Sequence, residues 1–564
     1  MNNWRRSAAL FLFFGLGWSS AAAAQTPAAV NPVAAVDTVA ASLAARNTTV
    51  EVTVDDAAVS RLRLLQLGGE PTSGFLLRST SSMLDRASAA GARGWQRLPF
   101  STRMVMNTAM PTAANDGALW AGKGISSITT FGARFAGGPL RIVVAPQAVA
   151  LRNADWKVRD TMVFWSPNPA PGRIGRAYAF SWYQGQFSID LPQRFGDESR
   201  AFIDPGQSSI YMKIGGVDAG AGTENHWWGP GIRNALVLSN AAPGFFHLFL
   251  RSARPLETRV GIIEWRWIVG GLKESDYFDA TPENDLRSLS AFGVAVQPWF
   301  ASDLTLGAAR SVMGTATGWG KIPVRWFEAF HATGRTTEQL AWDAAGPAGG
   351  REQILSLFAR YVMPDAGAEL YGEWGRTELP TSLRDLFIAP NHTQGYTVGF
   401  QWARPVSQGR SRFRAQGEIT TLEQSATFRD RPLGTWYSGR RIVQGYTHRG
   451  EMLGAVIGPG SSAQWFALDF IAPRSAIGAY LTRTRWNEDI HSIFDWPDYL
   501  QYCNHDVSVE AGVRGERWTR FGRLGGDVGL GHRRNVFFER AGCAGPTYRD
   551  IHNVGIRFSF APGR

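Results

Sequence analysis

The sequence predicts an all-β transmembrane protein, an antiparallel outer-membrane β-barrel with a small N-terminal periplasmic helical element. Three observations lead to this fold class. The chain begins with an export signal, it is rich in glycine and aromatic residues without a later long apolar run, and its apolar and polar side chains alternate repeatedly. An exported chain without apolar stretches of about 20 residues can cross a bilayer only with strands.

The first 24 residues have the pattern of a secretory signal peptide. Arg5 and Arg6 precede an apolar run from Ala8 to Trp18, and small residues follow up to Ala24. A charged start, a short apolar core and a small-residue cleavage site direct a chain to export. We therefore assign residues 1–24 to the signal peptide and expect the mature protein in the cell outer membrane.

Residues 25–100 are expected to form a periplasmic N-terminal segment with short helices. Two aspartates at 55–56 suit the start of a helix, and apolar residues follow at helical spacing over 57–67. A second helical pattern covers residues 75–91. The sequence therefore predicts a small helical element attached to the barrel.

Residues 101–564 are expected to form the barrel itself. The chain has 63 glycines, 22 tryptophans and 19 % charged residues, a composition that suits aromatic girdles and twisted strands. Period-two alternation is clear over residues 263–269, 396–402, 507–514 and 553–560. The aromatic end of the last strand is typical of the strand that such barrels present to their assembly machinery, an expected partner. Residues 424–460 contain no securely placed strand.

The net charge narrows the classes of partner. Lys and Arg outnumber Asp and Glu by 58 to 47, a net charge of +11 that falls to about +9 once Arg5 and Arg6 leave with the signal. An exported basic protein attracts acidic polysaccharide or lipopolysaccharide. The alternative is that arginines line the lumen and pair with Glu264, Glu373 and Glu510. We expect these partners and outer-membrane lipid, no nucleic acid, and a monomer.

The most distinctive stretch of the chain surrounds a tryptophan pair. Trp227 and Trp228 run into Gly229-Pro230-Gly231, which forces a tight turn. A short apolar strand is predicted next, over 235–238, followed by Ser239 and Asn240. This stretch holds no nucleophile and no phosphate-binding pattern, so we interpret the two tryptophans as structural, with ligand contact as the alternative.

This stretch resembles the signature of the capsule-assembly Wzi family, in which W-W-G-P-G precedes an apolar strand and an S-N-N-A-R-P segment. The matching residues are Trp227, Trp228, Gly229, Pro230, Gly231, Leu236, Leu238, Ser239, Asn240 and Ala241. Ala242 departs from that pattern, and Pro243 is kept. Residues 446–461 are similar to the family's later Y-x-x-R-G segment. The resemblance covers most of residues 50–560.

The resemblance implies a barrel of about 18 strands with an occluded lumen, and a lectin-like function in capsule assembly. Alternation alone gives a count near 19. In the family, extracellular loops attach capsular polysaccharide to the cell surface, so we expect this chain to bind and anchor capsular or another extracellular polysaccharide. A porin or solute channel is one alternative, and an exported carbohydrate-active enzyme that uses Asp489 and Asp495 is another.

The candidate polysaccharide-binding residues are Arg429, Arg431, Trp436, Tyr437, Arg440 and Arg441. Guanidinium groups bind carboxylates through paired hydrogen bonds, and aromatic rings stack on the apolar faces of sugars. An ordinary solvated loop with interface aromatics is the alternative. We predict no catalytic residue and no cofactor, and no metal, because the nine histidines show no metal-binding spacing. His226 is interpreted as hydrogen-bonded.

The two cysteines give an independent prediction. Cys503 and Cys543 flank a predicted hairpin of residues 504–517 and 524–538. If the chain ends in the periplasm, both cysteines fall in outward-facing loops, and the turn at 519–523 is periplasmic. We expect a disulfide between them in this oxidising compartment. Two free thiols too far apart to bridge are the alternative.

Overall fold

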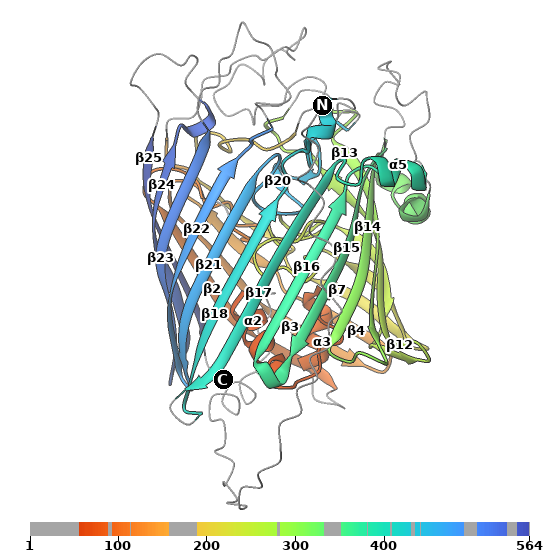
Figure 1. The fold of residues 1–564 in the computed structure, drawn as a ribbon, viewed down its shortest axis with the longest axis horizontal. Helices are drawn as coiled ribbons and strands as arrows, with labels where there is room; N and C mark the ends of the chain where they lie inside the picture. The colour runs from red at the N-terminus through yellow and green to blue at the C-terminus, as the bar shows by residue number, and fades with distance from the viewer. Residues whose placement is uncertain are drawn as a thin grey trace, which may run out of the picture. The chain divides into compact units, whose positions relative to one another are not determined.

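The computed structural model describes residues 56–87, 93–112, 114–156, 189–278, 282–331, 351–380, 382–406, 409–429, 435–439, 442–489, 505–538 and 550–562. All of them fall within one unit of the chain, Asp37–Arg564. Across these ranges, eighteen strands form a closed antiparallel barrel (Figure 1). This confirms the predicted fold class.

The barrel wall is built from strand segments in near-sequential order. They are β2 (Gly94–Asn107), β3 (Gly124–Gly137), β4 (Leu140–Val144), β5 (Gln147–Leu151), β6 (Arg200–Asp204), β7 (Ser209–Ile214), β8 (Val217–Gly222), β10 (His247–Ser252), β11 (Leu256–Thr258), β12 (Gly261–Lys273), β13 (Leu286–Pro298), β14 (Leu304–Thr315), β15 (Arg351–Met363), β16 (Ala368–Arg376), β17 (Gln394–Val406), β18 (Ser411–Thr421), β21 (Ser462–Ala472), β22 (Ser475–Trp486), β23 (Asp506–Thr519), β24 (Gly522–Arg534) and β25 (Ile551–Pro562). The alternating runs recognised in the sequence lie within β12, β17, β23 and β25.

Three strands of the wall are interrupted. β4 and β5 both pair with β3, β6 and β7 lie against that same interrupted strand, and β10 and β11 both pair with β12. Gly132 of β3 faces the first break, where a Cβ would lie 1.8 Å from the carbonyl oxygen of Val144. The ring closes where β2 pairs with β25, so the first barrel strand begins at Gly94, before the expected residue 101.

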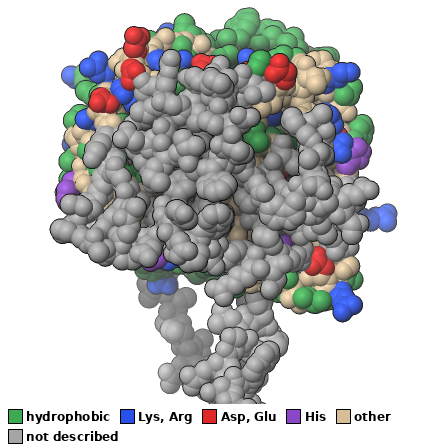
Figure 2. Space-filling view, turned by 90° about the horizontal axis from the view of Figure 1, so that it is seen from above, with side chains coloured by type: hydrophobic (Ala, Val, Ile, Leu, Met, Phe, Trp, Pro, Cys, Tyr) green, Lys and Arg blue, Asp and Glu red, His purple; other side chains and the backbone are tan. Residues whose placement is uncertain are grey.

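The two rims of the barrel differ in their connections (Figure 1). At one end, turns such as 138–139, 473–474 and 520–521 join neighbouring strands, and we call this end the short-turn rim. At the other, connections such as 152–199 and 422–461 are far longer, and this is the long-connection rim. Charged side chains of both signs are visible around the edge of the long-connection rim (Figure 2).

Alternation along each strand places apolar side chains outward. On β21, Phe466, Leu468 and Phe470 are 46–54 % exposed, whereas Ala467 and Asp469 between them are buried. A wall with apolar residues outside and polar residues inside is the pattern of a barrel that sits in lipid. None of the helices in the described ranges is both long and apolar enough to cross a bilayer.

The described part of the N-terminal segment that precedes β2, residues 56–87, lies inside the barrel near the short-turn rim (Figure 1). Helix α2 (Asp56–Gln66) confirms the first predicted helix. The second begins later than expected, because β1 (Leu77–Ser79) precedes α3 (Thr80–Ala87). Elsewhere in the described ranges the structure has helix α5 (Leu383–Ile388) and five 3-10 helices: η1 (Trp319–Lys321), η2 (Pro323–Phe330), η3 (Pro364–Ala366), η4 (Ala426–Arg429) and η5 (Val536–Phe538).

Helix α2 is held by charged groups of the wall. Arg63 Nη1 lies 2.6 Å from a Glu369 carboxylate oxygen of β16, and Arg360 of β15 binds the other oxygen of the same carboxylate. Arg360 also donates to Gln66 Oε1 over 2.7 Å. These side chains are at most 1 % exposed. Because buried charges must be paired, this network fixes the position of the helix in the lumen.

Two chain segments from the long-connection rim also fold inward. One carries β9 (His226–Trp228), and the other carries β19 (Thr447–His448) and β20 (Glu451–Met452). β1 pairs with β9, so the N-terminal segment and the first inward segment share a two-stranded sheet. This explains why residues 424–460 show no barrel-strand pattern: in the described parts of that range the chain packs inside the wall.

The lumen has two unlike sides. The inner faces of β10–β15, which we call the packed side, join a large apolar cluster with the inward segments through Ile268, Leu289, Ala291 and Phe358, all at most 4 % exposed. No described residue of β22–β25 belongs to that cluster. The inner faces of β22–β25, which we call the charged side, carry half-buried polar groups such as Glu510 and Asp527.

Candidate functional site

The tryptophan pair is fully enclosed in the lumen. Trp227 is 1 % exposed and Trp228 is not exposed at all. The Trp228 backbone N–H donates to the Leu238 carbonyl over 3.0 Å, and the Gly229 N–H donates to the Leu76 carbonyl over 2.9 Å. The pair thus joins the first inward segment to the N-terminal segment, which agrees with the structural interpretation.

The glycines of the motif are required by close packing. Gly229 has a φ of 124°, and a Cβ there would lie 2.7 Å from a carboxylate oxygen of Glu373 on β16. A Cβ on Gly231 would lie 1.9 Å from the Asn234 carbonyl oxygen. Arg63 of α2 donates to the carbonyls of Pro230 and Gly231. Only glycine permits this backbone to approach the wall so closely.

Two glutamates of the wall hold the loop that follows. Glu418 of β18 accepts the backbone N–H groups of Ile232, Arg233 and Asn234 at 2.5–3.1 Å. Glu373 accepts the N–H of Leu236 at 3.2 Å. Successive backbone N–H groups form a concave anion-binding site. Here the anion is a side chain of the barrel, so the loop is fixed and does not offer this site to a ligand.

The predicted strand at 235–238 is wrong. Residues Leu236 and Val237 are completely buried but belong to no ladder, and only Leu238 makes an isolated bridge, to Trp228. Their apolar side chains fill the main cluster of the lumen. An apolar run of four residues has the same pattern in a buried loop as in a strand, because both are surrounded by apolar groups on all sides.

The two family-like segments contact each other inside the barrel. The Ser239 N–H donates to the Leu453 carbonyl over 2.8 Å, and the Ser239 hydroxyl donates to the Gly454 carbonyl over 2.5 Å. The Tyr437 hydroxyl donates to the Leu236 carbonyl over 2.8 Å and accepts from the Ala455 N–H. Sequence reasoning identified both segments but not this contact, since nothing in either pattern points to the other.

The predicted sugar-binding cluster is only partly described. Arg431, Arg440 and Arg441 lie outside the described residues, and Arg429 ends η4 with only its backbone described. Trp436 and Tyr437 are 2 % and 3 % exposed, in the apolar cluster of the lumen. The Trp436 indole donates to the Thr393 carbonyl over 3.1 Å. The expectation that these two rings face a sugar from an open loop is therefore corrected: they face the interior.

Of the remaining residues predicted from the sequence, some lie outside the described ranges and one, Asp489, lies within them. Cys503, Cys543 and Asp495 lie outside the described residues. Asp489 is buried at the long-connection rim, where its carboxylate accepts from the Gln424 N–H over 2.8 Å and from the Thr435 hydroxyl over 2.5 Å. Burial raises the pKa of Asp489 to about 7, against the effect of these hydrogen bonds. The carboxyl thus ties the second inward segment to the end of β22.

His226 has a partner that the sequence did not reveal. Its Nε2 lies 2.9 Å from the Nε2 of His247, and Glu224 lies close enough for the three to hold a cation. His247 Nδ1 is hydrogen-bonded to the Phe245 carbonyl. Burial, with His247 and Arg266 nearby, lowers the pKa of His226 well below its usual range. The 2.9 Å separation is that of a hydrogen bond, so the hydrogen-bonded interpretation holds; the absence of a metal stays a prediction.

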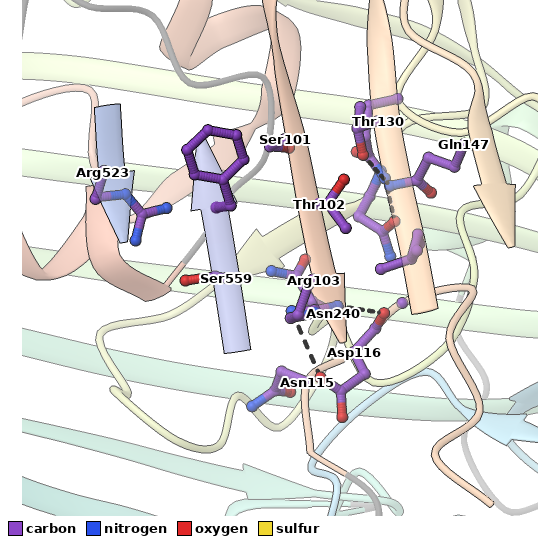
Figure 3. A pocket seen from close by; sticks show the side chains of 15 residues that line it. Ser101, Thr102, Arg103, Asn115, Asp116, Thr130, Gln147, Asn240, Arg523 and Ser559 are labelled. Carbon is purple, nitrogen blue, oxygen red and sulfur yellow. Dashed lines mark hydrogen bonds and ion pairs between the residues drawn. The ribbon is translucent and has the colours of Figure 1, made fainter. Parts of the chain in front are cut away.

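A small polar pocket lies between the lumen and strands β2, β3 and β25 (Figure 3). Its volume is about 70 Å³, which suits a few water molecules and not a sugar ring. Arg103 donates to the Asp116 carbonyl over 2.7 Å at its edge, and Asn240 of the motif also lines it. The pocket therefore places a motif residue beside polar groups of the wall.

One solved structure, with a TM-score above 0.5, supports the fold. The Escherichia coli protein described as Wzi, an outer-membrane carbohydrate-binding β-barrel involved in group 1 capsule assembly, is 11 % identical, with 93 % of this chain and 97 % of that chain covered and a TM-score of 0.52. Pseudomonas aeruginosa OccK5 (OpdH) is 9 % identical, with 83 % and 98 % covered and a TM-score of 0.38. A BenF-like porin from Pseudomonas fluorescens Pf-5 is 8 % identical, with 83 % and 98 % covered and a TM-score of 0.37.

The sequence comparisons decide the family. A search of curated proteins finds no significant match. The family model described as capsule assembly protein Wzi matches residues 181–491, more than half of the chain, including both segments that meet in the lumen. Both the resemblance of the tryptophan motif and the plugged barrel agree with that match. The chain therefore belongs to the capsule assembly protein Wzi family.

Proposed function

We propose that this protein is an outer-membrane polysaccharide-binding barrel that holds capsular or another extracellular polysaccharide at the cell surface. The family match over residues 181–491 carries this proposal. It is supported by the barrel, because the solved structure that shares the architecture is described as a carbohydrate-binding outer-membrane protein. The sugar recognised is expected to be acidic, since the chain is basic.

The orientation follows from the two rims. Outer-membrane barrels have short periplasmic turns and longer extracellular loops. The short-turn rim is then proposed to face the periplasm, with α2 and α3 at the periplasmic end as part of the N-terminal segment of residues 25–100, after removal of the signal peptide. The long-connection rim faces outward and meets lipopolysaccharide. β25, with its aromatic residues, is the strand offered to the barrel-assembly machinery, and the barrel is proposed to act as a monomer.

The site for the polysaccharide is proposed at the long-connection rim. Arg429, Arg431, Arg440 and Arg441 belong to the connection between β18 and β21, and their guanidinium groups suit acidic sugars. Trp436 and Tyr437 attach this connection to the interior of the barrel, through hydrogen bonds to the carbonyls of Thr393 and Leu236. The family motif from Trp227 to Asn240 acts as an internal support for the same connection.

Binding without turnover is proposed as the mode of action. A solute channel needs a lumen that is open from rim to rim, whereas α2, β1 and the inward segments all lie within the lumen of this chain. An enzyme needs carboxyl groups that reach a substrate, whereas Asp489, Glu373 and Glu418 each accept hydrogen bonds from the chain itself. These buried carboxylates hold the inward segments in place, which supports a structural role for them and not a catalytic one.

Deletion of the gene tests the proposal directly. Cell-bound and shed polysaccharide are measured in the wild-type strain, the deletion strain and the complemented strain. We expect the bound fraction to fall in the deletion strain and to return on complementation, with total polysaccharide unchanged. Equal retention in all three strains would contradict anchoring and leave the barrel assignment intact.

A further inference from the structure

A large cavity runs along the charged side of the lumen. Its volume is about 400 Å³, within the range of about 300–1,000 Å³ typical of small-molecule sites. Helix α2 bounds it on one side and the inner faces of β21–β25 on the other. The polar pocket of Figure 3 adjoins it, because Arg103, Asp116, Arg523 and Ser559 line both.

The cavity is elongated. Along β22 its lining extends from Ala476, next to the short-turn rim, to Trp486 at the last residue of the strand. Ten residue steps of a strand cover about 33 Å. A site of this length and moderate volume suits a narrow, chain-like ligand better than a compact one.

Positive charge exceeds negative charge in the lining. Eight arginines and five carboxylates line it, and one of these arginines, Arg533, is paired with Asp506 outside the lining. Two carboxylates are each shared by two arginines: Asp469 lies 2.9 Å from Arg414 and 2.8 Å from Arg514, and Glu516 lies 3.5 Å from both Arg61 and Arg523. Arg414 and Arg514 thus face a single carboxylate with two guanidinium groups, and this excess of positive charge would attract an added anion.

Aromatic rings accompany this charge. Arg233 and Arg514 lie 5.6 Å and 5.4 Å from the ring centre of Trp465, and Arg533 lies 4.7 Å from that of Trp486. Tyr480 and Trp486 are half-buried, so part of each ring faces the cavity. Guanidinium groups with aromatic rings bind the carboxylates and the apolar faces of acidic sugars.

The family motif forms part of the wall of this cavity. Arg233 and Asn234 line it, and Glu418 fixes the backbone of both residues from the opposite side. An adjoining pocket of about 60 Å³ is lined by Trp227 and Asn240. The motif therefore presents Arg233 to the charged side at a fixed position.

We propose that this interior cavity binds a carboxylate-bearing segment of an acidic saccharide chain, with Arg233 and Arg514 as its main anion-binding groups. The identity of the ligand class rests on the proposed function, whereas the site rests on the cavity itself. The site lies inside the barrel and is separate from the loops of the long-connection rim.

Binding of a trigalacturonate by the purified full-length protein tests this site, with the fully methyl-esterified trimer as the uncharged control. The Kd is measured by calorimetry in detergent at low and moderate salt. We expect the free acid to bind and the ester to bind at least tenfold more weakly. Equal binding of acid and ester, or no binding of either, would overturn the proposal.

Two variants locate the binding site. Arg514→Gln removes one guanidinium group but leaves Asp469 paired with Arg414, and Thr482→Trp fills the cavity without a change in charge. We expect each to weaken binding of the acid about tenfold. The matched control is Arg517→Gln, because Arg517 is exposed on the outer face of the same strand, and it should leave the Kd unchanged. An equal loss in Arg517→Gln would reveal a general charge effect and refute the interior site.

This experiment is independent of the test on cells. Retained polysaccharide in the deletion strain would refute anchoring while trigalacturonate binding could still be measured. Conversely, loss of retention on deletion with unaltered trigalacturonate binding in Arg514→Gln and Thr482→Trp would refute only the cavity. Folding of each variant is checked by the migration of unheated and heated protein on gels.

Discussion

The packed side and the charged side of the lumen share one strand pattern but bury their inward residues differently. On the packed side, Ser311 of β14 and Ser356 of β15 are completely buried under the inward segments. On the charged side, Tyr480, Glu510 and Asp527 point the same way along their strands and remain half-exposed. The difference lies in what covers the wall, because both sides alternate equally. Alternation specifies a wall, and the inward segments decide which part of it is a core.

The largest expected difference is in the free energy of unfolding lost when a tryptophan is removed from each side. Trp228→Ala removes a fully buried ring from the packed cluster and should lower the free energy of unfolding by about 3–5 kcal/mol. Trp486→Ala removes a half-buried ring on the charged side and should lower it by about 1 kcal/mol. Urea titrations of both variants in the same detergent measure the two values. Equal losses would mean that the two sides are equally packed.

A smaller difference is expected for glutamates. Glu418→Gln replaces a carboxylate that accepts three backbone N–H groups with an amide that offers only one acceptor, and should cost about 2 kcal/mol of stability. Glu510→Gln, where the carboxylate accepts mainly from Tyr480 at 2.7 Å, should cost less than about 1 kcal/mol because the site reaches water. If both cost the same, the anchoring role of Glu418 is wrong.

The stability of the contact between the second inward segment and the end of β22 should depend on pH through Asp489. Its folded pKa of about 7 lies above the unfolded value of about 3.9. Folding therefore favours the protonated acid, and the resulting stabilisation is complete below about pH 4 and lost as the pH rises through about 7. From pH 5 to pH 8 we expect the free energy of unfolding to fall by about 3 kcal/mol, because about two pH units lie below the folded pKa at about 1.4 kcal/mol each. The variant Asp489→Asn should flatten this slope, and an unchanged slope would assign it to another group.

The smallest expected effect is a difference in how readily solvent reaches side chains on the two sides of the lumen. Thr482→Cys on the charged side should react with a charged thiol reagent about tenfold faster than Ser311→Cys on the packed side, which corresponds to about 1.4 kcal/mol. Both substitutions are made in a chain whose Cys503 and Cys543 are replaced by serine. Equal rates would show that solvent reaches both sides alike and would remove the distinction between them.

Much of the wall could be predicted from the sequence, because alternation is a local property. The runs at 263–269, 396–402, 507–514 and 553–560 each fall inside one strand, and the helix at 57–67 follows from its spacing. The tryptophan motif identified the family for the same reason: its residues are adjacent in the chain.

The interior could not be predicted because its contacts are distant in sequence. Ser239 and Gly454 are 215 positions apart, and Tyr437 and Leu236 are 201 apart. Burial by such partners turned a predicted strand at 235–238 into a loop and placed Trp436 and Tyr437 in the core. The absence of alternation over 424–460 was the one local sign of an inward segment.

The pairing of β2 with β25 has a consequence for the order of assembly. This seam joins Asn107 to Asn553 through a hydrogen bond across 446 positions of sequence, and pairings at such separation form late. β1 and α2 precede β2 in the chain and lie within the ring that the seam closes. We expect the N-terminal segment to be inside before the last pair of strands meets, so insertion of α2 and β1 sets the earliest moment at which the barrel can close.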